Sequence, residues 1–440
     1  MRALLVNPWI YDFACYDLFS KPIGFLKIAH LLKRLGFVID YIDCLDRLHQ
    51  AMKKFKVKTT PYGCGNYYSE VVEKPAIFKD IPRYYKRYGM PPDIFKTLLK
   101  KIKKPDIILV SSGMTYWYKG VFEVINILKN KFKDTPLILG GIYATLCFEH
   151  AQRFSGADFI FKENIIDEFL KLVSKILNKE LYFYKDFKKL FPLYELYPEL
   201  NYVSLRTSGG CPFRCSYCGW YRIEKDLYQL PYEEVFRQIV YFYKKLNIRN
   251  FAFYDDCLLY NSDNHIKPLL KLILKNKIKA NFHTPNGLNA SFIDREIAYL
   301  LKRTNFVQVR LGLETSNSKL QEITGGKIDN FTIRKSISYL KEAGYSSEEL
   351  GVYLLMGLPQ QSFEDVKESI YFAHNLKVKV YLEEYSPVPG TVDYQKIGLP
   401  KDIDPLWHNN SIFPLYKGLE NYLKFQRLKD LNHKLNWKLN

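Results

Sequence analysis

Two stretches of the chain repeat one pattern, in which a short apolar run is followed by an amphipathic segment long enough for a helix. The apolar runs are too short to be helices themselves, so we expect them to be strands. Strands that alternate with helices form parallel sheets with the helices packed against them. The repetition therefore predicts an α/β protein with two units, at residues 1–180 and 200–390 of the 440-residue chain.

In residues 1–180 the pattern predicts a Rossmann-like sheet of the doubly wound, flavodoxin-like kind. The expected strands are RALLVNP, FVIDYIDCLD, PDIILVSSG, PLILGG and ADFIFKE. The expected helices cover residues 23–35, 119–132, 144–154 and 165–177. Residues 48–92 interrupt the pattern and are rich in Lys, Tyr, Pro and Gly. We expect them to form an ordered insertion over a functional edge, with a mobile loop as the alternative.

In residues 200–390 the repeats predict a partial (β/α)6 barrel, with functional residues at the carboxyl ends of its strands. The expected strands are NYVSLRT, FAFYD, ANFHT, FVQVRLGLE, GVYLLMG and KVYLEEYS. The expected helices cover residues 232–246, 265–274, 294–302, 332–343 and 363–376. Residues 181–199 are expected to be a linker between the units.

Residues 391–440 are expected to form a helical tail with a helix at 419–435. The tail holds Trp407, His408 and Tyr416. Ordinary packing explains such aromatic residues well, and a cap over the substrate is the second interpretation.

Three cysteines at CxxxCxxC spacing, Cys211, Cys215 and Cys218, carry the strongest chemical signal. Three thiolates from one loop can hold three corners of a cubane iron–sulfur cluster. Four-cysteine ligation is usual, so this loop would leave the fourth iron open to another ligand. An open iron indicates chemistry rather than storage of an electron.

Zinc and disulfide interpretations fit this spacing less well. Structural zinc sites usually take four protein ligands, and no second CxxC or HxxxH follows downstream. With 8 Cys in the whole chain and no secretory signal, a disulfide framework is disfavoured. The remaining cysteines stand alone, as small buried residues commonly do, so we expect no second cluster.

Composition indicates a globular protein with 47% hydrophobic residues. The first residues hold too short an apolar run for a signal peptide, and no run of about 18 apolar residues occurs. A cytoplasmic protein is therefore expected. The difference between 65 basic and 46 acidic residues gives a net charge of +19, but the lysines are spread along helices, which is typical of solvated faces. The abundant Lys, Ile and Tyr resemble proteins of heat-loving organisms.

The cysteine loop, with Tyr217 before its last cysteine and Gly219 after it, resembles the signature of the radical S-adenosylmethionine (radical SAM) superfamily. The resemblance implies that a [4Fe-4S] cluster binds the amino and carboxylate groups of S-adenosylmethionine at its open iron. One electron from an external donor of the ferredoxin or flavodoxin type would then split the sulfonium and free a 5′-deoxyadenosyl radical.

Several residues at expected strand ends fall where this family contacts S-adenosylmethionine. Asp255 and Asp256 would receive the amino group, Glu314 would lie near the ribose or methionine portion, and Gly357 lies in the MGLP segment expected against the adenine. His283, with Asn286 and Asn289 in the same loop, could reach cofactor or substrate. A strand-end Asp or His is also commonly a helix cap or a hydrogen-bonded spacer.

The first unit resembles the cobalamin-binding domain found ahead of many radical SAM domains. The resemblance rests on the strand ending in GG, the AT helix start and GADFIFKE. It implies cobalamin contacts at the strand ends, through Asn7, Trp9, Ser111, Ser112, Gly113, Gly140, Gly141 and Thr145. The DxHxxG motif that supplies a histidine to cobalt is absent, so a bound cobalt would lack that ligand. A Rossmann-like domain that has lost its cofactor is the alternative.

Together the resemblances predict a cobalamin-dependent radical methyltransferase that acts on an unactivated carbon of a small or lipid-like substrate. A cobalamin-assisted or cobalamin-free cyclisation, rearrangement or carbon–carbon coupling is the nearest alternative, which product mass would separate. A tRNA-modifying enzyme is disfavoured, because the amino-terminal cluster and the RNA-binding barrel of those relatives are missing. A non-catalytic iron–sulfur sensor or scaffold is the alternative from another class.

Overall fold

The computed structural model describes residues 1–162, 165–183, 186–400, 402–412 and 418–439. Glu163, at the end of one expected strand, and Tyr416 lie outside the described residues. The chain forms two compact units, and neither is one continuous stretch of sequence. The first comprises residues 1–200 and 400–408, and the second comprises residues 201–399 and 409–440.

The first unit is built on a parallel five-stranded sheet in the order β10-β9-β8-β1-β4. Its strands are β1 (Arg2–Asn7), β4 (Val38–Asp43), β8 (Ile107–Val110), β9 (Leu137–Gly140) and β10 (Phe159–Phe161). This order is the doubly wound, flavodoxin-like one, in which ligands bind beyond the carboxyl ends of the strands. The predicted fold class is confirmed for this unit.

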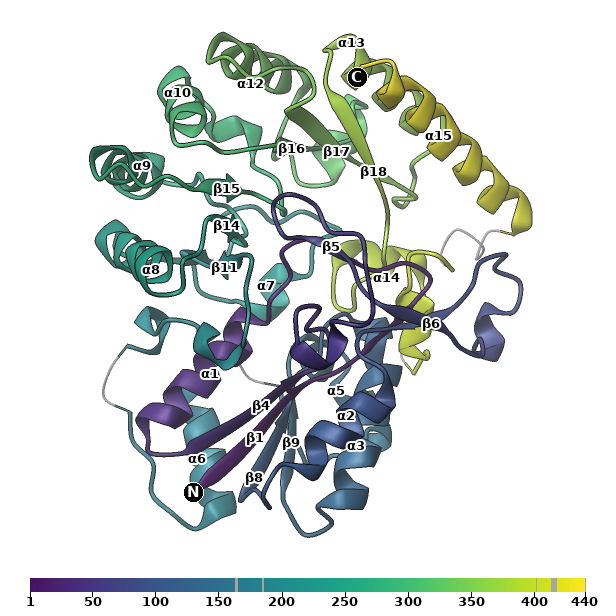
Figure 1. The fold of residues 1–440 in the computed structure, drawn as a ribbon. Coiled ribbons are helices and arrows are strands. Elements are labelled where there is room, and N and C mark those ends of the chain that lie inside the picture. The colour runs from purple at the N-terminus through teal and green to yellow at the C-terminus, as the bar shows by residue number, and fades with distance from the viewer. Residues whose placement is uncertain (163–164, 184–185, 401, 413–417, 440) are drawn as a thin grey trace. The chain divides into compact units, whose positions relative to one another are not determined.

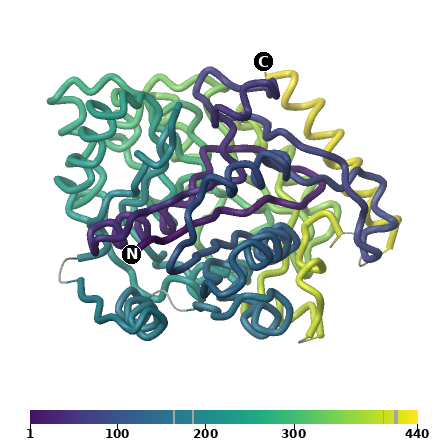
Figure 2. Tube along the Cα trace, turned by 60° about the horizontal axis from the view of Figure 1, so that its bottom comes forward, coloured from purple at the N-terminus to yellow at the C-terminus, as the bar shows by residue number. Residues whose placement is uncertain are grey.

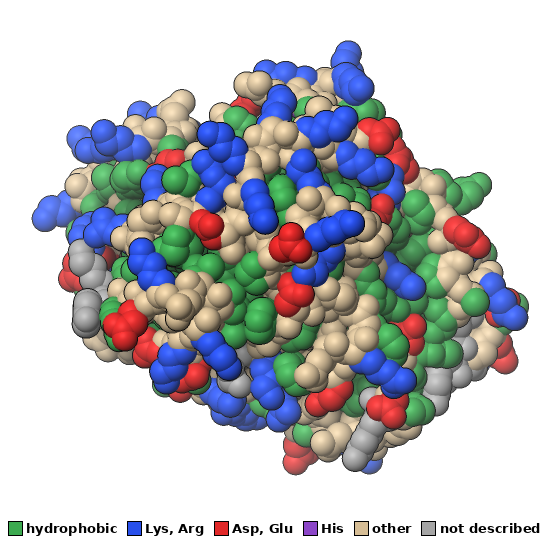
Figure 3. Space-filling view, turned by 90° about the horizontal axis from the view of Figure 1, so that it is seen from below, with side chains coloured by type: hydrophobic (Ala, Val, Ile, Leu, Met, Phe, Trp, Pro, Cys, Tyr) green, Lys and Arg blue, Asp and Glu red, His purple; other side chains and the backbone are tan. Residues whose placement is uncertain are grey.

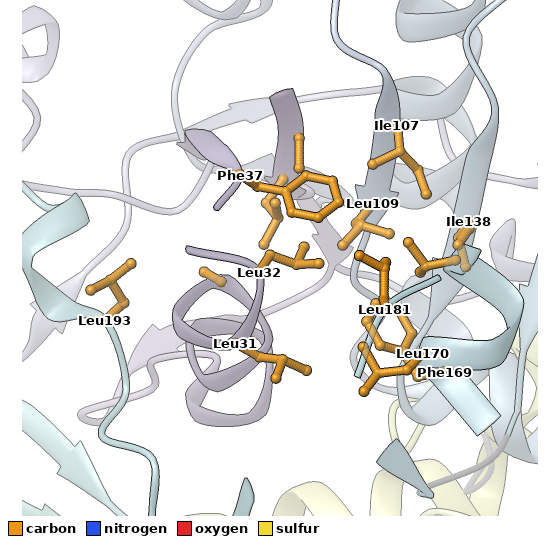
Figure 4. Close-up of a cluster of buried hydrophobic side chains, with 14 residues drawn as sticks. Leu31, Leu32, Phe37, Ile107, Leu109, Ile138, Phe169, Leu170, Leu181 and Leu193 are labelled. Atoms are coloured by element: carbon orange, nitrogen blue, oxygen red, sulfur yellow. The ribbon is translucent and has the colours of Figure 1, made fainter. Parts of the chain in front are cut away.

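Helices cover both faces of this sheet, as Figure 1 shows. One face packs against α1 (Ile23–Arg34) and α6 (Ile166–Leu177) through Leu31, Phe169 and their neighbours (Figure 4). On the opposite side Figure 1 shows α2 (Pro92–Lys100) and α3 (Tyr118–Lys131). The single helix expected at 144–154 is two, α4 (Ile142–Leu146) and α5 (Phe148–Phe154), because Cys147 leaves helical geometry with φ −123° and ψ 47°.

The insertion at residues 48–92 is folded in this structure. It contributes three short strands, β5 (Gly65–Asn66), β6 (Ser69–Val71) and β7 (Lys86–Tyr88). Near the start of the chain, β2 (Ile10–Asp12) pairs with β7 and β3 (Tyr16–Asp17) pairs with β5, while β6 pairs with the other side of β7, all antiparallel. The buried Arg47 fastens the insertion, pairing with Asp17 at 2.9 Å and donating to the Gly63 carbonyl at 3.0 Å.

Two segments expected elsewhere belong to the first unit. Residues 181–199, expected as a linker, bury Leu181 and Leu193 in the hydrophobic cluster beside α1 and α6. Residues 400–408, expected as part of the tail, end in a 3-10 turn whose His408 side chain meets Thr115 Oγ1 at 3.0 Å. Tyr118 also donates to the Asp404 carboxylate at 2.9 Å. Apolar burial explains the first difference, and these polar contacts explain the second.

The second unit carries parallel strands in two sheets, β11-β14-β15 and β16-β17-β18, which isolated bridges at Phe282–Phe306 and Leu288–Leu311 join into one curved wall. The strands are β11 (Val203–Leu205), β14 (Asn250–Phe253), β15 (Asn281–His283), β16 (Val309–Glu314), β17 (Leu350–Met356) and β18 (Lys379–Glu384). The helices between them are α8 (Tyr232–Lys245), α9 (Ile266–Lys275), α10 (Arg295–Arg303), α11 (Ser318–Ile323), α12 (Asn330–Glu342) and α13 (Phe363–Asn375). This arrangement is the predicted partial barrel.

The two faces of this wall differ in polarity. The helices form a row on its outside, coloured teal to green in Figure 2, and the residues turned toward them, such as Phe251, Leu311 and Val352, are at most 1% exposed. The alternate positions, including Arg310 and Tyr353, are partly exposed. The tail helix α15 (Leu419–Trp437) packs against β18, where Asn436 Nδ2 donates to the Val380 carbonyl at 2.8 Å. No helix among the described residues is both long and apolar enough to cross a membrane.

Candidate active site

The three cysteines of the signature lie on one loop, between β12 (Ser208–Gly209) and the short helix α7 (Trp220–Ile223). All three are free thiols; Cys215 is buried, and Cys211 and Cys218 are half-buried. The loop is held from behind, because Ser216 N donates to the Thr324 carbonyl at 3.1 Å and Ser216 Oγ to Asp393 at 2.9 Å. The loop therefore presents its thiols from a fixed backbone.

The cysteine loop is the part of the chain that would hold a cluster. Among the described residues, no three His, Cys, Asp or Glu side chains converge closely enough to ligate one metal ion. A cubane cluster takes its thiolates at separate corners, so it does not need that convergence. Cys211, Cys215 and Cys218 are the three thiols that would occupy those corners.

A fourth cysteine lies beside this loop. The thiols of Cys257 and Cys211 are in hydrogen-bond contact, which lowers the pKa of Cys211, and Lys327 and Arg214 lower it further. A low thiol pKa favours the thiolate, which is the form that binds iron. Sequence analysis treated Cys257 as an isolated cysteine, because nothing local ties it to a residue 46 positions earlier in the chain.

A partly buried ion pair, Glu314 with Lys327, lies next to the loop. Their Oε1 and Nζ atoms are 2.5 Å apart. Glu314 ends β16 at a bulge, in the left-handed region with φ 65°. Burial opposes the charge of Lys327, but Glu314, with Tyr217 and Cys215, more than offsets it and raises the pKa of Lys327. Tyr217, which belongs to the cysteine signature, thus also lies close to the charges of Glu314 and Lys327.

Lys327 is the charged residue that sequence analysis missed. It follows Gly325 and Gly326, which both have positive φ. A side chain on Gly325 would come within 3.0 Å of Cys215 Cα, so glycine allows the two loops to touch. The paired glycines before a lysine were the available signal.

Asp255 and Asp256 hold the strand that leads into the cysteine loop. Asp255 Oδ1 accepts from Thr207 N at 2.9 Å and from Ser208 N at 2.6 Å, whereas its buried Oδ2 has no hydrogen-bond partner among the described residues. Asp256 pairs with Arg206 at 3.1 Å and accepts from Gly210 N at 3.0 Å. Burial raises the pKa of Asp256 to about 7. Both acids thus fix the backbone of residues 207–210, which leads into the cysteine loop.

The other residues expected at these strand ends take mainly structural contacts. His283 is 3% exposed and near Asn250, at the start of β14, and burial, with Arg310, lowers its pKa to about 3, so it is neutral. Asn286 donates to the Tyr254 carbonyl at 3.2 Å, and Asn289 caps a short turn by accepting from Ser291 N. Gly357 has φ 93°, and its N–H donates to Gln361 at 2.9 Å.

At the carboxyl edge of the first unit's sheet, polar side chains bond to one another. Ser111 Oγ donates to Asn7 Oδ1 and Asn7 Nδ2 donates to Asp43, both at 2.7 Å. The Tyr197 hydroxyl donates to the other oxygen of Asp43 at 2.5 Å. Ser112 Oγ donates to the Gly140 carbonyl at 2.7 Å. Sequence analysis did not include Asp43 and Tyr197 in this row.

The remaining edge residues divide into packed and open positions. Trp9 is 1% exposed and donates its indole N–H to the Met90 carbonyl at 2.7 Å, so its ring belongs to the core of the unit. A side chain on Gly141 would strike the Ser112 carbonyl at 2.3 Å, and one on Gly113 would strike Trp117 at 2.9 Å. A side chain on Gly140 would meet only the Phe161 carbonyl, at 3.7 Å. Thr145 Oγ1 donates to the Gly141 carbonyl at 2.9 Å.

The positive net charge is not gathered into one stripe on the face drawn in Figure 3. Lys and Arg side chains there are spread among acidic and apolar ones. Nucleic-acid binding generally needs a clustered basic surface, so this view offers no support for a nucleic-acid partner.

Comparisons with known proteins agree with this geometry. Residues 205–373 match the profile of the radical SAM superfamily. No curated protein matches the chain in sequence. The fold is similar to that of the radical S-adenosylmethionine methyltransferase TsrM from Kitasatospora setae, solved with tryptophan substrate and an S-adenosylmethionine analogue, with TM-score 0.66, 14% identity, and 93% of this chain and 83% of that chain covered.

A second similar structure is that of OxsB, a cobalamin-dependent S-adenosylmethionine radical enzyme, with TM-score 0.57 and 15% identity over 92% of this chain and 56% of that one. At these identities the likeness concerns the fold, whereas the profile match covers the cysteine loop and the strands that follow it. Residues 205–373 thus form a radical SAM domain.

Proposed function

We propose that this enzyme is a cobalamin-dependent methyltransferase that uses reductive cleavage of S-adenosylmethionine to act on an unactivated carbon. One observation carries the proposal: three free thiols on a fixed loop lie next to a partly buried carboxylate–ammonium pair, Glu314 with Lys327. Cys211, Cys215 and Cys218 would hold a [4Fe-4S] cluster, which would supply the electron for reductive cleavage of S-adenosylmethionine. The family requires an external one-electron donor, which we expect to be of the ferredoxin or flavodoxin type.

The buried charges fit the methionine end of S-adenosylmethionine, which carries one carboxylate and one ammonium. Lys327 offers a cation to the carboxylate, and Glu314 offers an acceptor to the ammonium. Asp255 Oδ2, buried without a partner among the described residues, is a further acceptor for a donor group. When S-adenosylmethionine binds, the pair between Glu314 and Lys327 would be replaced by two pairs, one at each end of the methionine part. Each charge would then stay compensated, as charges removed from water need to be.

The first unit fits a large neutral ligand at its carboxyl edge. A side chain on Gly140 would meet only the Phe161 carbonyl, at 3.7 Å, and Ser111 and Thr145 are only partly buried. The fold similarity to TsrM, one structure of which contains cobalamin and a [4Fe-4S] cluster, supports the same use of this unit. Cobalamin held at this edge would supply a methyl group, while Ser111 and Thr145 would bond its amide periphery.

Anaerobic reconstitution with iron, sulfide and hydroxocobalamin tests the proposal. We expect about four irons and one cobalt per chain. With dithionite and S-adenosylmethionine, 5′-deoxyadenosine should form. Cys215→Ala should lose iron and cleavage, whereas Cys147→Ala, a buried cysteine of the first unit, should retain both.

Iron without cobalt would contradict the cobalamin part and favour a cobalamin-free radical reaction. Iron that never supports cleavage would revive the sensor or scaffold interpretation. With a substrate in hand, a product heavier by one carbon would support methylation, and an unchanged carbon count would favour cyclisation or rearrangement.

A further inference from the structure

The inner face of the barrel wall carries charged and aromatic side chains on β16, β17 and β18. In the strand register, Tyr353 lies beside Tyr381, and Leu355 beside Glu383. Gly312 on β16 is the register partner of Tyr353. Arg310 lies two residues before Gly312, and its side chain is partly exposed, as that of Glu314 is. The helix-facing residues of β18, Val380 and Leu382, are apolar, so the alternation turns Tyr381 and Glu383 to the inner face.

Arg310 is a fixed cation on this face. Its guanidinium lies 4.0 Å from the Tyr381 ring centroid, and Nη1 donates to the Tyr353 hydroxyl at 2.8 Å. That hydroxyl donates in turn to the Pro285 carbonyl at 2.8 Å. Gly351 makes room for the arrangement, since a side chain there would come within 2.5 Å of the Tyr381 ring. A guanidinium has five N–H donors, so these contacts leave donors for a ligand.

Glu383 is a carboxylate with no counter-ion of its own. Its two acidic neighbours are neutralised, Glu384 by Lys429 at 2.6 Å and Glu314 by Lys327. Among the described residues, Glu383 has no hydrogen-bond or ion-pair partner. Its side chain is exposed, and partial desolvation, with the charges of Glu384 and Glu314, raises its pKa, while Arg310 opposes the shift. An exposed carboxylate without a counter-ion is accessible to a cationic or hydrogen-donating group of a ligand.

Arg310 and Glu383 act on each other electrostatically without forming an ion pair, so they are separated rather than joined. We propose that they bind the two charged ends of a zwitterionic substrate, a free α-amino acid, with its carboxylate at Arg310 and its ammonium at Glu383. The inference rests on the proposed radical chemistry and names the substrate class for it. A planar guanidinium matches a carboxylate with two parallel hydrogen bonds, which fixes the orientation of the bound molecule.

Calorimetric titration of the reconstituted enzyme with each proteinogenic L-amino acid, under anaerobic conditions and with S-adenosylmethionine present, tests this inference. At least one amino acid should bind, and its amide and its N-acetyl derivative should bind at least about tenfold more weakly, because each lacks one charge. Glu383→Gln should weaken binding of that amino acid by about ten- to a hundredfold. Glu384→Gln is the matched control, since its side chain pairs with Lys429, and it should bind normally.

Three outcomes would overturn the inference. One is that no amino acid binds to enzyme that still binds and cleaves S-adenosylmethionine, in which case the proposed function stands without this substrate class. Another is that Glu383→Gln weakens S-adenosylmethionine binding instead, which would assign Glu383 to the cosubstrate. The third is that the amide and N-acetyl derivatives bind as well as the amino acid. Enzyme that neither retains iron nor cleaves S-adenosylmethionine would mark failure of the proposed function itself.

Discussion

The carboxyl edges of the two sheets use their polar residues in different ways. In the first unit, Ser111, Asn7, Asp43 and Tyr197 form an unbroken row of hydrogen bonds. In the second unit, the cysteine loop is bordered by the partly buried pair of Glu314 and Lys327. The buried Asp255 Oδ2 has no hydrogen-bond partner in the described part of the chain, and the exposed Glu383 has none there either.

An edge whose polar side chains bond to one another and an edge with groups that lack partners suit different ligands. Unpaired buried polar groups cost free energy, so they persist where a bound molecule compensates them. The second edge therefore suits a charged ligand that supplies its own donors and acceptors. The first edge suits a ligand recognised by shape and by backbone contacts. The difference agrees with S-adenosylmethionine at one edge and cobalamin at the other.

The largest effect on stability is expected at the partly buried ion pair of Glu314 and Lys327. Glu314→Gln leaves Lys327 without its counter-ion and should cost about 2 kcal/mol in the free energy of unfolding, between the values for exposed and fully buried pairs. Glu349→Gln breaks a more exposed pair with Lys302 and should cost at most about 1 kcal/mol. Urea unfolding measures both losses. Equal losses would contradict the larger cost assigned to the charges beside the cysteine loop.

A shape-based first edge should be blocked by bulk alone. Gly140→Val adds a side chain whose Cβ would meet only the Phe161 carbonyl, at an ordinary contact distance of 3.7 Å, so it should reduce cobalamin retention more than about tenfold while leaving the unfolding midpoint unchanged. Absorbance after desalting measures the retained cobalamin. Gly141→Ala is the contrasting variant, because its Cβ would strike the Ser112 carbonyl at 2.3 Å and should lower stability. Full retention by a folded Gly140→Val protein would remove the edge from the cobalamin site.

The first unit also contains a buried acid, Asp46, next to Asp43 of this row, and its effect should appear in the pH dependence of stability. Burial raises the pKa of Asp46 to about 6. The folded protein therefore holds this proton where the unfolded chain has released it. Stability through this group falls as the pH rises toward its folded pKa, by about 1 kcal/mol between about pH 5 and about pH 7. Asp46→Asn should lose that decrease in urea unfolding at the two pH values, and an unchanged slope would contradict the assignment.

The smallest effect is expected at Cys257. Its contact with Cys211 would give a hydrogen bond to a cluster ligand, and such bonds stabilise the reduced cluster. Cys257→Ala should lower the midpoint potential in a redox titration followed by electron paramagnetic resonance, and Cys257→Ser should restore it in part. Cys44→Ala, in the first unit, is the control. Iron loss in Cys257→Ala would instead make Cys257 a ligand of the cluster.

Local periodicity was enough to predict most of the fold. The helix expected at 363–376, for example, is α13 (Phe363–Asn375), because the apolar period and the Ser362 cap are both local signals. The strands of the insertion have two or three residues each and no measurable period, so only their distant partners define them. The apolar residues of 181–199 gave no sign of which unit they would join.

Sequence reasoning reached the three cysteines, whose spacing carries chemistry, and Glu314, an acid at a strand end, and their roles stay predictions. Lys327 and Cys257 depend on contacts between loops that are far apart in the sequence. Glu383 was within reach of sequence reasoning, because Val380 and Leu382 mark the apolar face of the strand and place Glu383 on the other one. The tertiary fold decides that Glu384 and Glu314 have a lysine as counter-ion and that Glu383 does not.

The assignment of residues 400–408 to the first unit has a consequence for biosynthesis. Proteins are made from the amino terminus, and domains generally fold as units as they emerge. Here the first unit cannot acquire its contacts to Asp404 and His408 until nearly all of the second unit has been translated. During synthesis, Tyr118 and Thr115 therefore lack their hydrogen bonds to Asp404 and His408 until this segment has been made. A gene truncated after residue 200 would encode a first unit without these contacts.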